Sequence, residues 1–254
     1  MSEANAPALS TRGLAMSFGS LVVAKDIELS LPKGVRYALI GPNGAGKTTL
    51  INLMTGMLKP NAGQIFLGGE DITALEPQER VRRGLARTFQ INSLFPGLTA
   101  LEAVTLAVCE RRGSSGEFWS KLSSQSEAID EAHEILLRLR LGDSCYQPTR
   151  ELPYGRQRLL EIARALATRP KVLLLDEPAA GVPQEESGDI FEAVADLSQD
   201  ITLLFIEHDM HVVFRFASHI IVLVGGMVFA QGSPAEIAAD PRVREVYLGK
   251  RKHG

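Results

Sequence analysis

The segment that most constrains the fold is the glycine-rich stretch Gly41–Thr49, which reads GPNGAGKTT. It fits the pattern G-x-x-x-x-G-K-[ST]; an apolar, strand-like run ends just before it at Ile40, and a helix-like run continues from Leu50. Glycines allow a tight turn whose backbone N–H groups face phosphate oxygens, and the start of the helix adds partial positive charge. The sequence therefore predicts a phosphate-binding P-loop between a strand and a helix.

Individual positions of this loop have predicted roles. Lys47 supplies a mobile positive charge for the β and γ phosphates of a nucleotide, and Thr48 supplies a hydroxyl for Mg²⁺. The other positions expected to bind the nucleotide are Asn43, Gly44, Ala45, Gly46 and Thr49. The alternative, a glycine-rich turn without a ligand, is disfavoured because both flanking elements are those that a P-loop requires.

Two adjacent carboxylates form a second candidate cluster. The apolar run Val172–Leu175 ends in Asp176 and Glu177, as expected of a buried parallel strand that delivers charge to the edge where open α/β sheets bind ligands. Asp176 is predicted to hold Mg²⁺, and Glu177 to polarise the water that attacks the γ-phosphate. Alone, the pair would indicate only a strand ending in solvated acids; the P-loop in the same chain favours the functional interpretation.

Hydrophobic patterning predicts an α/β fold: a P-loop NTPase core with a mostly parallel sheet, an antiparallel β subdomain and an inserted α-helical subdomain. Expected strands and hairpins cover residues 9–18, 26–31, 37–40, 64–72, 86–90, 171–175, 201–206 and 220–230. Expected helices follow the P-loop and cover residues 77–83, 99–109, 129–139, 155–167, 186–197 and 234–248, with the helix 77–83 charged enough to be solvated. The expected division is a single domain over 1–254, with the core at 9–91 and 151–254 and the helical subdomain at 92–150.

Composition restricts the function classes. A net charge of −3 argues against electrostatic binding of nucleic acid or anionic lipid. The only cysteines, Cys109 and Cys145, lack metal-ligand spacing and indicate packing roles in a reducing compartment. We expect no signal peptide and no transmembrane segment, because the N-terminus is polar and the apolar runs are too short to span a bilayer. The chain is expected to be soluble.

Further segments, in their order along the chain, carry a family resemblance. They are Arg87–Gln90, Leu152–Arg158 followed by Glu161–Leu166, and Glu207–Asp209 at the end of an apolar strand. Together with the P-loop and the acidic strand, this set resembles the nucleotide-binding subunit of ABC transporters from about Leu9 to Leu248. The finer resemblance is to the ATPases of branched-chain amino acid importers, and it rests on Arg87–Gln90, Tyr154-Gly155, Asp176–Gly181 and Val246–Gly249.

The resemblance implies an ATPase that needs ATP and Mg²⁺, and it assigns further residues. Gln90 matches a glutamine that ligates Mg²⁺ or water, although a lone glutamine could be a polar strand end. His208 matches a histidine that hydrogen-bonds the γ-phosphate, although a lone histidine could be structural. Phe18 matches an aromatic that stacks on adenine, although it could equally belong to the core. Gly155 and its helix N-terminus can face a phosphate.

The implied partners are transmembrane permease subunits, a second ATPase subunit in a homo- or heterodimer and, indirectly, a solute-binding protein, but no nucleic acid. The implied location is peripheral, at the cytoplasmic face of the inner membrane. The loop Leu94–Leu98 could contact a short permease helix, or Leu94 and Phe95 could simply cap the core.

Two departures from the family concern the dimer. Pro153 replaces the serine whose hydroxyl would meet a γ-phosphate, and Pro183 replaces an aspartate that couples two sites. Since proline offers neither a hydroxyl nor a backbone donor, we hypothesise an asymmetric ATPase pair. This chain would then complete its own ATP site with a partner's signature segment.

Other functions remain as alternatives. Lipid or lipopolysaccharide exporters have ATPases that share much of this pattern. A soluble ABC ATPase acting on DNA or ribosomes is disfavoured by the single P-loop and by the lack of a heptad run or basic bias. A nucleotide-binding regulator without turnover is disfavoured by Glu177.

Overall fold

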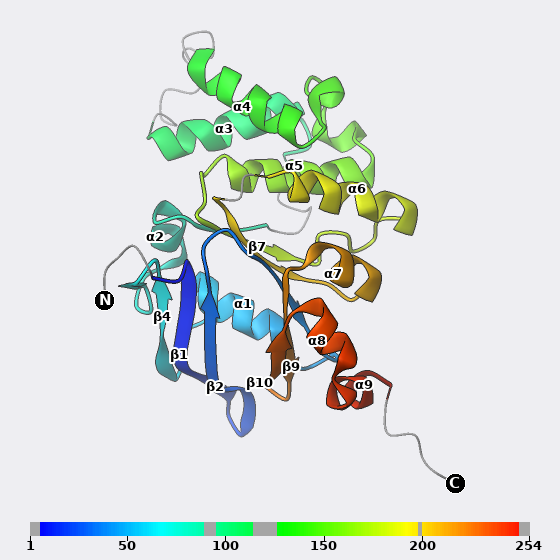
Figure 1. Cartoon of the computed structure of the whole chain (residues 1–254). Coiled ribbons are helices and arrows are strands. Elements are labelled where there is room, and N and C mark those ends of the chain that lie inside the picture. The colour runs from blue at the N-terminus through cyan, green and yellow to red at the C-terminus, as the bar shows by residue number, and fades with distance from the viewer. Residues whose placement is uncertain (1–5, 89–94, 114–125, 198–199, 249–254) are drawn as a thin grey trace.

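The computed structural model describes residues 6–88, 95–113, 126–197 and 200–248. Within them, two β-sheets lie beside a layer of helices, and the helices α3 and α4 form the outermost layer at the top of Figure 1. This arrangement confirms the predicted α/β class.

The central sheet has six strands and is mostly parallel, as predicted. Its order is β10-β9-β3-β8-β7-β6, and only β10 runs antiparallel to its neighbour. The strands are β3 (Arg36–Ile40), β6 (Leu85–Arg87), β7 (Val172–Asp176), β8 (Thr202–Ile206), β9 (His219–Val224) and β10 (Met227–Gly232). Along β7, Leu173 and Leu175 pack into one hydrophobic cluster, and Val172 and Leu174 into the other. Helices therefore cover one face, and α1 with the antiparallel sheet covers the other, which explains the uninterrupted apolar runs.

The second sheet is antiparallel and has the order β2-β1-β4-β5. Its strands are β1 (Leu9–Phe18), β2 (Leu21–Leu31), β4 (Ala62–Leu67) and β5 (Glu70–Asp71). β2 begins at Leu21, earlier than the predicted Asp26, because a two-residue turn joins it directly to β1 and Phe18 pairs with Leu21. The exposed side chains of Leu21 and Val22 break the alternating pattern on which the prediction relied.

The helices of the core agree with the sequence except at one place. They are α1 (Lys47–Thr55), α2 (Pro77–Arg82), α5 (Tyr154–Leu166), α6 (Gln184–Ala195), α7 (Met210–Phe216), α8 (Pro234–Ala239) and α9 (Pro241–Leu248). The exception is α7, a two-turn helix that was not predicted from the sequence. Its local signal is the side chain of Asp209, which accepts a hydrogen bond from the His211 backbone N–H at 2.8 Å and caps the helix.

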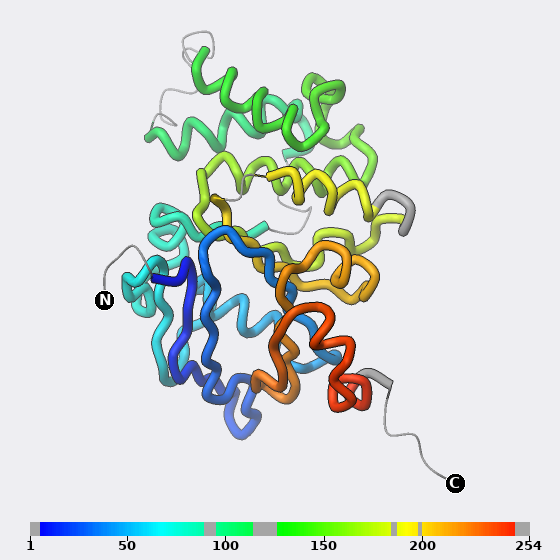
Figure 2. The backbone as a smooth tube through the Cα atoms, viewed as in Figure 1, coloured from blue at the N-terminus to red at the C-terminus, as the bar shows by residue number. Residues whose placement is uncertain are grey.

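The outer helices are α3 (Ala100–Arg112) and α4 (Ser126–Arg138), which pack against each other and against α5. The tube in Figure 2 shows both crossing above α5. α3 begins with the predicted signature: the Thr99 hydroxyl accepts from the Glu102 N–H, and the Glu102 carboxylate accepts from the Thr99 N–H. Short 3₁₀ turns, η5 (Gly142–Ser144) and η6 (Thr149–Glu151), lead back to α5, and Cys109 and Cys145 are both buried.

The prediction that residues 77–83 form a solvated helix is wrong for Arg80. This side chain is 1% exposed, and its guanidinium donates hydrogen bonds to the carbonyls of Leu53, Met54, Thr73 and Leu75 at 2.7–2.9 Å. The last carbonyls of a helix lack partners within the helix. Arg80 supplies donors to the end of α1 and so fixes the helix that carries the P-loop.

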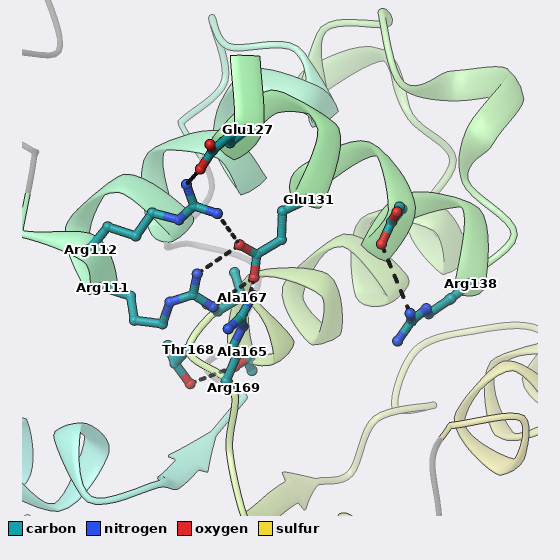
Figure 3. Close-up of polar contacts among 10 residues, drawn as sticks. Arg111, Arg112, Glu127, Glu131, Arg138, Ala165, Ala167, Thr168 and Arg169 are labelled. Carbon is teal, nitrogen blue, oxygen red and sulfur yellow. Dashed lines mark hydrogen bonds and ion pairs between the residues drawn. The ribbon is translucent and has the colours of Figure 1, made fainter. Parts of the chain in front are cut away.

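A cluster of charges joins the outer helices to the core (Figure 3). The Glu131 carboxylate on α4 accepts hydrogen bonds from Arg111, Arg112 and Arg169 at 2.7–2.9 Å. Arg111 also donates to the Ala167 carbonyl, just after α5. These donors, of which Arg111 has the largest effect, lower the pKa of Glu131 to about 2, so its carboxylate is ionised at neutral pH.

We expect the substitution Glu131→Gln to lower the free energy of unfolding by about 2 kcal/mol at neutral pH. The folded pKa lies below the ordinary value of 4.5, so this stabilisation is complete above that value and is lost as the pH falls through about 2. Urea unfolding at several pH values measures the effect. The control is Glu134→Gln on the same helix, whose exposed carboxylate lies 4.0 Å from Arg138; equal losses in both variants would contradict the prediction.

Candidate nucleotide site

The P-loop follows β3 and ends where α1 begins at Lys47. Two of its glycines are required by close backbone approach. A Cβ on Gly41 would lie 2.2 Å from the Leu223 carbonyl oxygen, and a Cβ on Gly46 would lie 2.5 Å from that of Val23. Gly46 also has a φ of 100°, which is unfavourable for residues with a side chain. The loop is therefore wedged between β9 and β2.

The remaining loop residues present backbone or side-chain groups. Ala45 is buried, and its backbone N–H and carbonyl are bonded to Pro42 and Gly226. Asn43, Gly44 and Thr48 are exposed and Thr49 is partly exposed. The N–H groups in the first turn of α1 have no acceptor within the helix, so they and the helix dipole can receive an anion.

Lys47 is folded onto the loop. Its ammonium donates to the carbonyls of Gly41 at 2.7 Å and Pro42 at 3.2 Å. Burial lowers the pKa of Lys47, and the negative charges of Glu177 and Asp176 partly offset this effect. The ammonium thus lies within the electrostatic influence of both acids.

One cavity brings the predicted groups together. Its lining includes Thr48 from the P-loop and both acids, Asp176 and Glu177, from the end of β7. Glu177 has a φ of 49°, in the left-handed region that residues with a side chain seldom adopt. Such strain persists where the surrounding structure enforces it, and here the Glu177 N–H is bonded to the Ile206 carbonyl at the end of β8.

His208 and Glu177 are direct partners. The Nε2 atom of His208 lies 2.9 Å from Oε1 of Glu177, and both side chains are about half exposed. The parallel register of β7 and β8 explains the contact, because Asp176 pairs with Ile206 and each strand is followed by its polar residues at the same edge.

Two further residues, quoted in sequence only as motif members, have contacts at this edge. Glu207 is buried and accepts hydrogen bonds from the N–H groups of Ala179 and His208, and burial raises its pKa. Arg87 donates to the Asp176 carboxylate at 2.5 Å. The sequence signal for both is a charged residue at the end of a buried strand, to which we gave a chemical role only at Asp176 and Glu177.

The other predicted positions lie elsewhere. Phe18 is 50% exposed at the end of β1, so its ring does not belong to the core. Gln90 lies outside the described residues. Gly155 is buried in the first turn of α5 and lines a separate cavity with Pro153 and Arg156. Pro153 is the N-cap of α5, with a φ of −52° and no hydrogen bond from its side chain.

The residues present fit a bound Mg²⁺. Among the described residues, no group of three or more His, Cys, Asp or Glu side chains could hold a metal by itself. Mg²⁺, however, is commonly held by one or two carboxylates together with substrate phosphates and water. The Thr48 hydroxyl and the Asp176 carboxylate offer such hard oxygen donors in one cavity.

Comparisons with known proteins identify the class. The family described as ABC transporter matches residues 24–180, and the one described as branched-chain amino acid ATP-binding cassette transporter matches residues 228–253. The chain belongs to the ATP-binding subunits of ABC transporters, a family that hydrolyses ATP to power transport.

Individual relatives are similar over nearly their whole length. The branched-chain amino acid transport ATP-binding proteins BraF of Pseudomonas aeruginosa and LivG of Escherichia coli K12 are each 39% identical, over 96% of this chain and 98% of theirs. A solved ATP-binding cassette in its ADP conformation is 34% identical, with a TM-score of 0.83 over 95% of this chain and 98% of that one. A dimeric bacterial ABC transporter cassette is 25% identical, with a TM-score of 0.74 over 89% and 98%. Among the described residues, no helix is long and apolar enough to cross a membrane.

Two glycines of the loop, the tightly packed Gly46 and the unobstructed Gly44, provide a test of the P-loop geometry. We expect Gly46→Ala to lower the free energy of unfolding by at least about 3 kcal/mol, since the new methyl group meets the Val23 carbonyl in an unfavourable φ. The control Gly44→Ala, with a φ of 77° but no atom within 4 Å of the new Cβ, should cost only about 1 kcal/mol. Urea unfolding measures both, and a larger loss for Gly44→Ala would contradict the description.

Proposed function

We propose that this protein is the ATP-hydrolysing subunit of an importer for branched-chain amino acids or similar small solutes. The observation that carries the proposal is the cavity that joins the P-loop hydroxyl of Thr48 to Asp176 and Glu177, with His208 bonded to Glu177. The names of the relatives and the match of the C-terminal segment support the substrate class.

In the proposed site, the nucleotide is held by the P-loop and by β1. The free N–H groups at the start of α1 and the Lys47 ammonium bind the β and γ phosphates, with Asn43, Gly44, Ala45, Gly46 and Thr49 completing the loop. The half-exposed ring of Phe18 stacks on adenine. Thr48 and Asp176, with Gln90 by resemblance, hold Mg²⁺, which neutralises charge on the phosphate oxygens.

Hydrolysis needs a base and a contact to the γ-phosphate. Glu177 lies at the edge of the cavity, where its carboxylate can accept the proton of the attacking water. His208 is bonded to Oε1 of Glu177, and its imidazole can instead donate to a γ-phosphate oxygen. The buried Glu207 accepts hydrogen bonds from the backbone N–H groups of Ala179 and His208. It therefore fixes the backbone of His208 and of the segment just after Glu177.

The proposed assembly contains permease subunits, a second ATPase subunit and, indirectly, a solute-binding protein, at the cytoplasmic face of the inner membrane. The existence of a dimeric relative cassette supports pairing. Gly155 lies outside the cavity of its own P-loop, which is compatible with service to a partner's nucleotide. We further propose the division into a core at 9–91 and 151–254 and a helical subdomain at 92–150. Phe95, from the loop suggested to contact the permease, is 52% exposed.

The hydrolytic role of Glu177 is tested by Glu177→Gln. We expect the steady-state ATPase rate of the purified transporter to fall by about 10²–10⁴-fold, because the amide cannot accept the proton, while ATP binding persists. The control is Glu76→Gln, an exposed carboxylate paired with Lys59. A variant that retains more than half of the rate would exclude Glu177 as the base.

The asymmetry is tested by Pro153→Ser, which restores the hydroxyl at the N-cap of α5. If this chain offers its partner a weakened signature segment, we expect the substitution to raise ATP turnover of the assembled complex about two- to tenfold. The ATPase rate of the complex measures this, with Pro148→Ser, the N-cap of η6, as the control. Unchanged turnover would show that Pro153 is neutral in the complex.

A further inference from the structure

Arg87 lies between two cavities. It is the last residue of β6 and lines the candidate nucleotide cavity together with Thr48 and Asp176. It also lines a mostly apolar groove between α1, α2 and β6 on one side and α3 and α5 on the other. Besides Arg87, the charged residues of this groove are Glu110, Glu161 and Arg164. Arg87 thus lines both the candidate nucleotide cavity and the groove.

On the nucleotide side, Arg87 is bonded to one oxygen of the Asp176 carboxylate, the group assigned to the proposed metal. One guanidinium nitrogen donates to Oδ2 of Asp176 at 2.5 Å, and the other donates to Oδ1 of Asn52 at 2.6 Å. The arginine side chain is only 14% exposed, and its Nε is buried without a hydrogen-bond partner in the described part of the chain. Since a guanidinium and a divalent cation both seek the same carboxylate, they compete for Asp176.

On the groove side, Glu161 has an acceptor without a partner. This residue of α5 is 5% exposed, and its Oε2 accepts a hydrogen bond from Arg158 at 3.1 Å. Its Oε1 is buried and has no hydrogen-bond partner among the described residues. An unpaired buried carboxylate oxygen is costly, so a donor that reaches it gains free energy.

We propose that Arg87 is a positioning residue with two alternative acceptors: it holds Asp176 before the metal binds, and it turns to Glu161 when a divalent cation takes the Asp176 carboxylate. The inference rests on the proposed function in one respect, the assignment of Asp176 as a metal ligand. As a consequence, metal binding in the nucleotide cavity would create an ion pair between Arg87 and Glu161 in the groove.

The test measures binding of Mn²⁺, a spectroscopic substitute for Mg²⁺, to the purified full chain saturated with ADP, by electron paramagnetic resonance. We expect Arg87→Met to raise the Mn²⁺ affinity about three- to tenfold, because the competing cation is gone. Arg87→Lys, which keeps a charge without the two-pronged geometry, should raise it less. The control Arg83→Met changes the net charge equally but removes pairs with Glu70 and Glu79, and should leave the affinity unchanged.

A second variant tests the alternative acceptor. We expect Glu161→Gln to lower the Mn²⁺ affinity about threefold, because Arg87 then has a weaker alternative acceptor and remains bonded to Asp176. In the Arg87→Met background the same substitution should have no effect. A merely structural role of Glu161 would give the same change in both backgrounds, and that result would overturn the second acceptor.

Asp176→Asn separates the inference from the proposed function on which it rests. If this variant leaves Mn²⁺ binding unchanged, the metal assignment itself is wrong, and the inference falls with it. If it weakens binding while Arg87→Met leaves the affinity unchanged or lowers it, the metal site stands and the inference is overturned. Thermal unfolding of every variant establishes that each remains folded.

Discussion

The structure depends on how closely the P-loop backbone packs between its neighbours. Gly41 and Gly46 lie against the carbonyl oxygens of Leu223 and Val23, at distances that leave no room for a Cβ. This contact fixes the start of α1 relative to β9 and β2. The buried guanidinium of Arg80 fixes the other end of the helix through its last carbonyls. With both ends held, the N–H groups and dipole of α1 have a fixed direction, which preorganised binding of a phosphate requires.

The parallel sheet then determines which groups meet that direction. β7 and β8 are neighbours in register, so the polar residues after each strand appear at one edge. This geometry makes Asp176, Glu177 and His208 neighbours. The cavity that Asp176 and Glu177 line also includes Thr48, which is far from all three in the sequence. The outer helices are tied to the same framework by the Glu131 cluster. Hence the outer helices are attached by hydrogen bonds to the segment that follows α5.

Much of this could be predicted from sequence because its signals are local. The P-loop pattern, the buried run ending at Asp176, the hairpins at paired glycines and the capping box at Thr99 each depend on a few adjacent residues. The contacts that could not be predicted join residues that are far apart in the sequence. Nothing near Arg80 indicates that carbonyls 26 and 27 positions earlier would bury it. Likewise, Arg87 and Asp176 are 89 positions apart, and only the pairing of β6 with β7 makes them partners. The family resemblance suggested Phe18 and His208 as candidates, but their exposure and contacts required the structure.

The contact between His208 and Glu177 has a consequence for the order of events. An oxygen that already accepts from an imidazole is less available to an attacking water. In the proposed reaction, the imidazole must therefore leave Glu177 before the base is fully free, and the γ-phosphate is the acceptor that attracts it away. A diphosphate offers no such acceptor, so the pair can close again after the reaction. The contact between His208 and Glu177, at 2.9 Å, would thus leave the base free when a triphosphate is bound and occupied when a diphosphate is bound.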